Sequence, residues 1–112
     1  MGENRDMNPR RVHELMRQHF PEVDAASRDW VVVADGDGLR RGVLQDLINE
    51  YISGADLLVE ACRKVGDCLP TSAALDFVAK HAGQGDIRLA NRDFTGYVVV
   101  LANGVASGWN AH

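Results

Sequence analysis

The chain has 112 residues, the usual length of one domain, so its functional surface must be built on a single hydrophobic core. Hydrophobic residues make up 46% of the sequence and charged residues 25%, a balance that excludes a disordered or fibrous protein. The formal net charge of −4 disfavours nucleic-acid partners, because an acidic body repels phosphate backbones, and it favours protein partners.

The apolar runs and the cysteines indicate the compartment. The longest apolar runs, 31–34 and 98–102, are far shorter than the roughly 20 residues that cross a bilayer, and the N-terminus lacks an apolar signal segment. We therefore expect a cytoplasmic protein that does not bind membranes. Cys62 and Cys68 are too few for a disulfide scaffold, and Cys62 lies on an apolar helical stripe that predicts a buried thiol.

The N-terminal part of the chain is predicted as a tail followed by a helix. Residues 1–7 are polar and show no period, so we interpret them as a disordered tail or an expression remnant, and 8–112 as a single α+β domain. Asn8 followed by Pro9 is typical of a helix N-cap with proline at the first helical position. Apolar residues then recur at helical spacing and predict a helix over 9–19.

The middle of the chain is predicted as one strand followed by three helices. The β-branched run over 30–34 is typical of a buried strand. Apolar stripes at helical spacing predict helices over 39–53, 55–65 and 71–82, with a break at Gly54 between the first two. A single long helix that bends at Gly54 is the alternative.

The C-terminal part changes to a period of two and is predicted as a small antiparallel sheet. Strands are expected over 86–91 and 97–102. Asn103-Gly104 is a strong signal for a two-residue type I′ hairpin turn, which needs positive φ at both central residues. Such a turn fixes the strand register, with Trp109 opposite Val98. That register gathers five residues on one face, which we expect to be buried: Val98, Val100, Ala102, Val105 and Trp109.

These elements define an α+β fold with three to four helices and a small antiparallel sheet. Three helices followed by two strands is also the order of a winged helix-turn-helix, in which the helix over 71–82 enters a DNA groove and the loop 92–96 is the wing. Arg88 and Arg92 would then contact phosphates, and the helix in the groove offers Lys80. A winged-helix DNA-binding transcriptional regulator is therefore the alternative function.

One short string carries two carboxylates into a glycine turn. Residues 31–39 form an apolar strand that ends in Asp35 and Asp37, one residue apart. The string resembles the first motif of the haloacid-dehalogenase-like phosphatases. The resemblance spans nine residues and implies a nucleophile at Asp35, a general acid/base at Asp37 and a Mg²⁺ ion that bridges carboxylate and phosphate.

The rest of the sequence departs from that phosphatase pattern. Such enzymes need a later lysine and a further acidic metal-binding element, whereas Lys80 is the only lysine after Lys64 and no acidic residue follows Tyr97. A plain strand-to-helix turn, with Asp37 as the cap of the next helix, is the preferred interpretation. A Mg²⁺-dependent phosphatase-like enzyme ranks third among the functions.

The histidines do not predict a metal or cofactor site. His13 is expected on the polar side of the first helix and His19 on its apolar side, and His81 lies next to a helix end, where a protonated imidazole interacts favourably with the helix dipole. No cysteine, histidine or acid falls at ligand spacing with them, and the sequence contains no phosphate loop or nucleophile motif. We expect no metal and no cofactor.

The lack of recognisable chemistry favours a protein that is not an enzyme. We expect a small acidic binding protein that docks on another protein, as inhibitors, immunity proteins, adaptors and phage or plasmid accessory proteins do. The partner would be basic, and the outer edge of the C-terminal hairpin is a candidate for pairing with it or with a second copy in a homodimer. The candidate partner-binding residues are Asp76, Lys80, Arg88, Arg92 and Asp93.

Overall fold

The fold is a mixed α+β arrangement in which three helices pack on an antiparallel sheet. The computed structural model describes residues 8–21, 29–54, 56–62 and 65–110. The described helices are α1 (Pro9–His19), α2 (Arg41–Tyr51) and α3 (Thr71–His81). The described strands are β1 (Val31–Val32), β2 (Ala34–Asp35), β3 (Gly38–Leu39), β4 (Asp56–Cys62), β5 (Val65–Pro70), β6 (Ile87–Asn91), β7 (Gly96–Val100) and β8 (Val105–Asn110).

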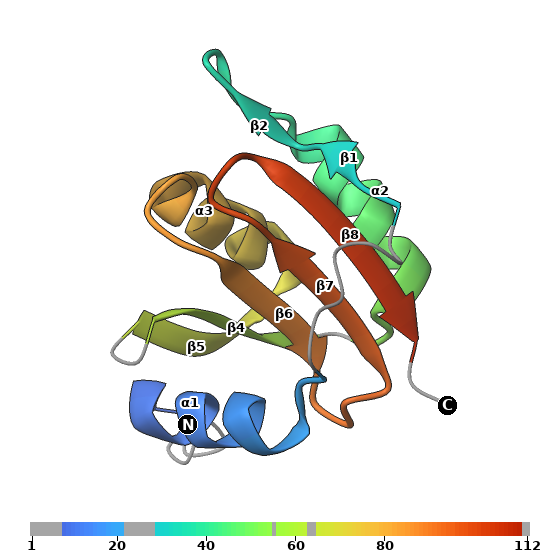
Figure 1. Ribbon diagram of the computed structural model, residues 1–112. Helices are drawn as coiled ribbons and strands as arrows, with labels where there is room; N and C mark the ends of the chain where they lie inside the picture. The colour runs from blue at the N-terminus through green and yellow to red at the C-terminus, as the bar shows by residue number, and fades with distance from the viewer. Residues whose placement is uncertain (1–7, 22–28, 55, 63–64, 111–112) are drawn as a thin grey trace.

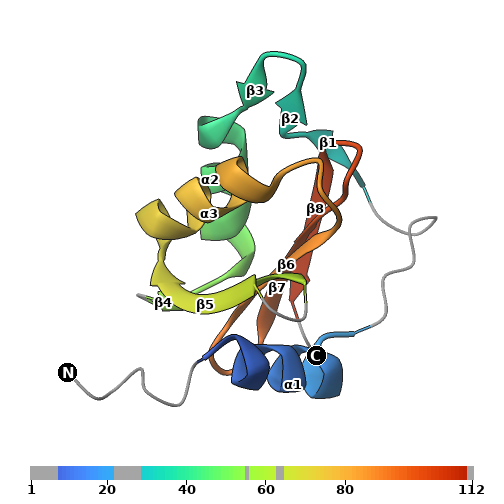
Figure 2. The same ribbon diagram turned by 90° about the vertical axis from the view of Figure 1, so that its left-hand side faces the viewer.

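The sheet is the middle of three layers. Six strands follow the order β1-β8-β7-β6-β4-β5, and each neighbouring pair is antiparallel, while β2 and β3 form a separate hairpin. α1 packs on one face of the sheet, and α2 with α3 packs on the other (Figures 1 and 2). Among the described helices, none has the length and apolar content needed to span a membrane.

Each face of the sheet has its own apolar core. On the α1 face, the fully buried side chains of Val12 and Met16 pack on strand residues that include Leu58. On the opposite face, Leu44 of α2 and Val78 of α3 are also fully buried. Because successive side chains of a strand point to opposite faces, strands covered on both faces are apolar at nearly every position.

The predicted elements with strong local signals are confirmed. α1 spans the predicted residues, and the Asn8 side chain accepts a hydrogen bond from the backbone N–H of Arg11 at 2.9 Å. The bounds of α3, β6 and β7 also agree closely with the predicted ranges. α2 begins at Arg41 and not at residue 39, because Gly38 and Leu39 pair with β2.

The helix predicted over 55–65 is wrong, because residues 56–62 form β4 and residue 65 begins β5, while residues 55, 63 and 64 lie outside the described part of the chain. β4 pairs with β5 on one side and with β6 on the other. Its side chains alternate between two covered faces, so Leu57 and Leu58 are both buried and the period of two is hidden in the sequence. Cys62 lies in β4 and not on a helix, and its side chain is outside the described part of the chain; Cys68 is a buried free thiol.

The predicted register of the C-terminal hairpin is wrong by one residue. The loop has three residues, 102–104, because the backbone N–H of Leu101 donates to the Val105 oxygen at 2.8 Å and Gly104 alone has positive φ in this loop, at +93°. Trp109 therefore lies opposite Tyr97, on the α1 face, and not opposite Val98. A one-residue shift moves a side chain to the other face of a sheet, and Ala102 is exposed as a result.

The edges of the sheet also differ from the prediction. The strand expected to be buried over 30–34 is divided between β1 and β2, and in β1 the side chains of Val31 and Val32 are 40% and 48% exposed. β1 pairs with residues 105–106 of β8, so β8 is not an edge strand there. The two edge strands are β1 and β5.

Candidate functional site

The five residues predicted to bind a partner do not form one site. Asp76 and Lys80 lie on α3, and Asp76 forms an ion pair with Arg41 of α2 at 2.7 Å. Arg88 lies in β6 with its side chain on the opposite, α1 face of the sheet, next to Glu60. The remaining two, Arg92 and Asp93, are exposed in the turn between β6 and β7.

Asp35 and Asp37 lie on the β2–β3 hairpin in an arrangement that explains the turn. Asp35 accepts hydrogen bonds from Arg40, at 2.6 Å from Nη2 and 3.1 Å from Nε, and from the backbone N–H of Asp37 at 2.9 Å. The side-chain hydrogen bond from Arg40, followed by the bond from Asp37, holds the pKa of Asp35 below its ordinary value. The predicted helix cap at Asp37 is wrong, because α2 follows Arg40 and has no side-chain cap.

The hairpin does not provide the setting that the phosphatase resemblance implies. That setting places both carboxylates at the end of a strand in a parallel sheet, whereas β2 pairs with β3 in an antiparallel hairpin. Within the described ranges, no three histidine, cysteine or acidic residues are grouped closely enough to hold a metal ion. The carboxylate of Asp35 is instead engaged by a guanidinium.

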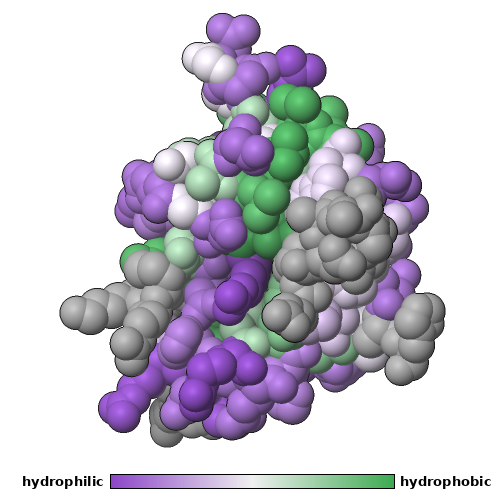
Figure 3. Space-filling model, viewed as in Figure 1, coloured by the Kyte–Doolittle hydropathy of each residue, from purple (hydrophilic) through white to green (hydrophobic). Residues whose placement is uncertain are grey.

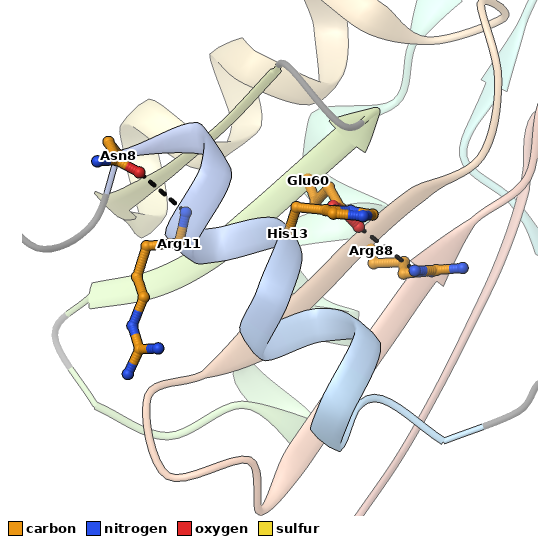
Figure 4. Close-up of polar contacts among 5 residues, drawn as sticks. All are labelled: Asn8, Arg11, His13, Glu60 and Arg88. Carbon is orange, nitrogen blue, oxygen red and sulfur yellow. Dashed lines mark hydrogen bonds and ion pairs between the residues drawn. The ribbon is translucent and has the colours of Figure 1, made fainter.

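A buried carboxylate connects α1 to the sheet. Glu60 of β4 has a side chain that is only 5% exposed, and it lies between His13 of α1 and Arg88 of β6 (Figure 4). The His13 Nδ1 is 2.6 Å from Glu60 Oε2, and the Arg88 Nη1 is 3.3 Å from Oε1. His13 therefore faces the sheet, and its predicted place on the polar side of α1 is wrong. Because a buried charge is costly unless it is paired and hydrogen-bonded, this network helps to fix α1 on β4.

The sequence contains one signal for this network. Glu60 is a lone acid within the apolar run 57–62, and an acid in such a run indicates a buried charge that needs donors. The signal depends on a strand assignment, because on the predicted helix the same residue would face solvent. The donors themselves lie 47 and 28 residues away in the chain and have no local signature.

The upper part of the α1 face carries an apolar row that α1 does not cover completely. Val32 pairs with Val105, and Leu101 is hydrogen-bonded across from Val105, so the three side chains share one face. We call these three residues the edge row. Val32 is exposed, while Val105 and Leu101 are half-buried. Figure 3 shows a band of apolar side chains over β1, β8 and β7, below the polar tip of the β2–β3 hairpin.

A groove of about 380 Å³ extends this surface toward α1. Phe20, next to α1, and Val99 and Leu101 of the sheet contribute its apolar lining. Arg17 and Arg88 also line the groove, and the Arg88 guanidinium lies 5.8 Å from the centre of the Phe20 ring. Asp86 is the acidic residue of the same lining, so the groove combines apolar area with charged side chains of both signs.

A second groove, of about 430 Å³, lies between the β2–β3 hairpin, the end of α3 and the loop 102–104. Among the described residues, Asp35 is the one charged residue of its lining, and that carboxylate is already paired with Arg40. Most of the remaining lining consists of alanine and glycine residues. This groove offers few groups that could select a ligand.

Comparisons of the chain with protein-family models, with curated proteins and with solved structures find no match. The function is therefore inferred from the surface of this chain. Of the described residues, three large hydrophobic side chains are exposed, namely Val31, Val32 and Val43. Two of the three are adjacent on an edge strand, which makes β1 and the edge row the candidate functional site.

Proposed function

We propose that the protein is a small, acidic, non-catalytic binding protein that docks on another protein, in the manner of an inhibitor, immunity protein, adaptor or phage or plasmid accessory protein. The proposal rests on one observation, the pair of exposed valines on the edge strand β1. Edge strands present unpaired backbone groups, and exposed apolar surface beside them is typical of an interaction site. We place this activity in the cytoplasm.

The residues around β1 also favour this surface as the docking site. The edge row continues the apolar area from β1 onto β8 and β7, and the groove beside α1 extends it further. Protein interfaces commonly combine an apolar centre with arginines, as found here for Arg17. The net charge of −4 favours a basic partner through electrostatic steering.

Affinity capture from the source cell, with mass spectrometry of the bound proteins, tests the proposal. We expect the wild-type protein to enrich at least one protein, and Val32→Lys to lose it, because a charge at the centre of an apolar interface is strongly unfavourable. Val43→Lys is the matched control, since Val43 is a similarly exposed valine (39%) on α2 and not on β1. The control should capture the same protein as the wild type.

Two outcomes would contradict this function. Enrichment of nucleic acid without any protein would favour a nucleic-acid-binding regulator. Capture that is unchanged in Val32→Lys would show that the partner does not use β1. Thermal unfolding of both variants provides the check that they are folded, so that a loss of capture is attributable to the surface.

The two alternative functions have less support. A winged-helix DNA-binding regulator needs three consecutive helices, and the second of these, predicted over 55–65, is replaced by strand β4. Of its proposed phosphate contacts, Arg88 is paired with Glu60. A Mg²⁺-dependent phosphatase-like enzyme would need Asp35 free to attack phosphate, and Asp35 is paired with Arg40.

A further inference from the structure

The backbone of β1 is oriented for pairing on its outer side. The N–H of Val33 donates to the Gly104 oxygen at 2.8 Å, on the side of β8. Val32 pairs with Val105, whose backbone groups are directed to β7 because its oxygen accepts from Leu101, so this is a non-hydrogen-bonded pair and the N–H and C=O of Val32 point away from β8. β1 lies at the outer edge of the sheet in Figure 1. An added strand would therefore meet the hydrogen-bonding groups of Val32.

The opposite edge of the sheet is protected against such pairing. β5 ends in Pro70, which has no N–H, and the N–H of Cys68 already donates to the Asp67 carboxylate at 2.8 Å. A register irregularity in β4 also disrupts the ladder near residues 60–62. β1 contains neither proline nor charge. The contrast singles out β1 as the edge that accepts a strand.

The charged residues near β1 indicate which charge a partner strand should have. Residues 29–40 contain the acids Asp29, Asp35 and Asp37 and one basic residue, Arg40; since Arg40 is paired with Asp35, the charges of Asp29 and Asp37 are left to act on a partner. A second copy of this chain paired along β1 would bring two such acidic segments together, in addition to a net charge of −4 on each copy. A strand from a different protein, with basic residues on both sides of its apolar centre, would pair with them favourably.

We propose that the partner binds by adding one extended strand to β1, and that this strand has apolar residues at alternate positions flanked by lysine or arginine. The inference rests on the proposed function and specifies the chemistry of its partner. Main-chain hydrogen bonds to Val32 give the affinity, and the alternate apolar side chains extend the edge row. The flanking basic residues give specificity and a salt-dependent association rate.

A designed peptide tests this mode of binding. The probe is the capped peptide Lys-Val-Thr-Val-Thr-Val-Lys, titrated into the ¹⁵N-labelled protein at low salt and followed by amide chemical shifts. We expect the largest shifts at residues 31–35. Replacement of both lysines by glutamate should weaken binding at least about tenfold, and N-methylation of the central backbone amides should abolish it.

Val32→Pro makes the corresponding change in the protein. It removes the outward N–H, and a proline is tolerated on an edge strand where the N–H faces outward. We expect at least about tenfold weaker peptide binding than for the wild type, with Val43→Lys unchanged. Shifts that map away from β1, or equal binding of the N-methylated peptide, would overturn strand addition. The N-methylated peptide keeps this test valid if Val32→Pro does not fold.

The partner captured from cells separates this inference from the function on which it rests. Capture that is lost in Val32→Lys but kept in Val32→Pro would show docking on this surface without strand pairing, so the function would stand and strand addition would fail. Capture that persists in both variants would show that the partner does not use β1, so the proposed site and strand addition would both fail, whereas enrichment of no protein by the wild type would refute the function itself. Loss in both variants, together with binding of the peptide at β1, supports both.

Discussion

At the scale of single residues, Glu60 is the position where a side chain and the fold depend most directly on each other. Its carboxylate is almost completely buried in the sheet, and its two donors come from a helix and from a neighbouring strand. The contact with His13 is shorter than that with Arg88, 2.6 Å against 3.3 Å. His13 is also the more buried donor, with 26% of its side chain exposed against 44% for Arg88.

This difference predicts that His13→Ala destabilises the protein more than Arg88→Ala. We expect His13→Ala to lower the free energy of unfolding by about 1.5–3 kcal/mol, the usual contribution of a hydrogen bond to a charged group, and Arg88→Ala to lower it by about 1 kcal/mol. Urea unfolding followed by circular dichroism measures both. Gln18→Ala, at an exposed position of α1, is the control and should change the free energy of unfolding by under about 0.5 kcal/mol. Equal losses for the two donors would contradict this assignment.

Residue-scale features could be predicted from the sequence only where the partners are close in the chain. The Asn8 cap of α1 follows from the pair Asn8-Pro9, because the atoms that it joins are three residues apart. Asp35 and Arg40 are also close in the chain. Their pairing could not be predicted, because the charged residues of a turn can pair in several ways and the sequence does not indicate which pair forms. The network of Glu60 depends on which strands are neighbours, and so it could not be predicted.

At the scale of secondary structure, the loop 102–104 shows how one residue decides a register. The sequence Asn103-Gly104 is compatible with a two-residue turn, in which both residues have positive φ, and with a three-residue loop, in which only the last one does. The chain adopts the second form. The oxygen of Gly104 accepts hydrogen bonds from Val33 and Ala34, so a contact with the distant β1–β2 segment accompanies this choice. That contact joins residues far apart in the chain, so it cannot be predicted from the local sequence.

Gly104→Ala should therefore be more damaging than the same change at another glycine with positive φ. A Cβ at residue 104 would overlap the backbone oxygen of Ala34, whereas a Cβ at Gly83, where φ is +85°, meets no neighbour within 4 Å. We expect Gly83→Ala to cost about 1 kcal/mol, from the left-handed backbone alone, and Gly104→Ala to cost at least about 2 kcal/mol. Thermal unfolding of both variants measures the difference. Equal melting temperatures for the two variants would show that the overlap with Ala34 adds no destabilisation.

The helices of this protein were predictable because each has one apolar face. α1 and α3 are amphipathic, and their boundaries carry local signals in the cap Asn8 and in Pro70. β4 is different, because it is covered on both faces and its apolar run fits a helix as well as a strand. Competition between the two periods is resolved only by the pairing of β4 with β5 and β6.

At the scale of the whole molecule, the fold joins the two halves of the chain through β8. This strand pairs with β7 on one side and with β1 on the other, so residues 31–32 meet residues 105–106. Trp109 packs with Tyr97 and Phe20 on the α1 face, with ring centroids 5.6 Å and 5.8 Å away. The order of strands in the sheet depends on this long-range pairing, and for that reason the topology could not be predicted from local patterns.

Truncation after Gly104 should unfold the protein. It would remove β8, leave β1 without its neighbour and expose the cores on both faces, to which Ala106 and Trp109 contribute. We expect the amide resonances to lose their dispersion and the cooperative thermal transition to disappear. A chain that ends at Asn110 retains every described strand and is the control. A cooperative transition in the shorter chain would show that β8 is dispensable.

The protection of β5 has a consequence for the composition of any complex formed through this sheet. Growth of a sheet by repeated pairing requires two accepting edges, one to receive each copy and one to offer the next. Pro70 and Asp67 block pairing on the β5 side, so of the two described edges of the six-stranded sheet β1 is the one open to a strand. For the proposed strand addition, we therefore expect association along the sheet to saturate at a stoichiometry of one to one and not to continue into a fibre.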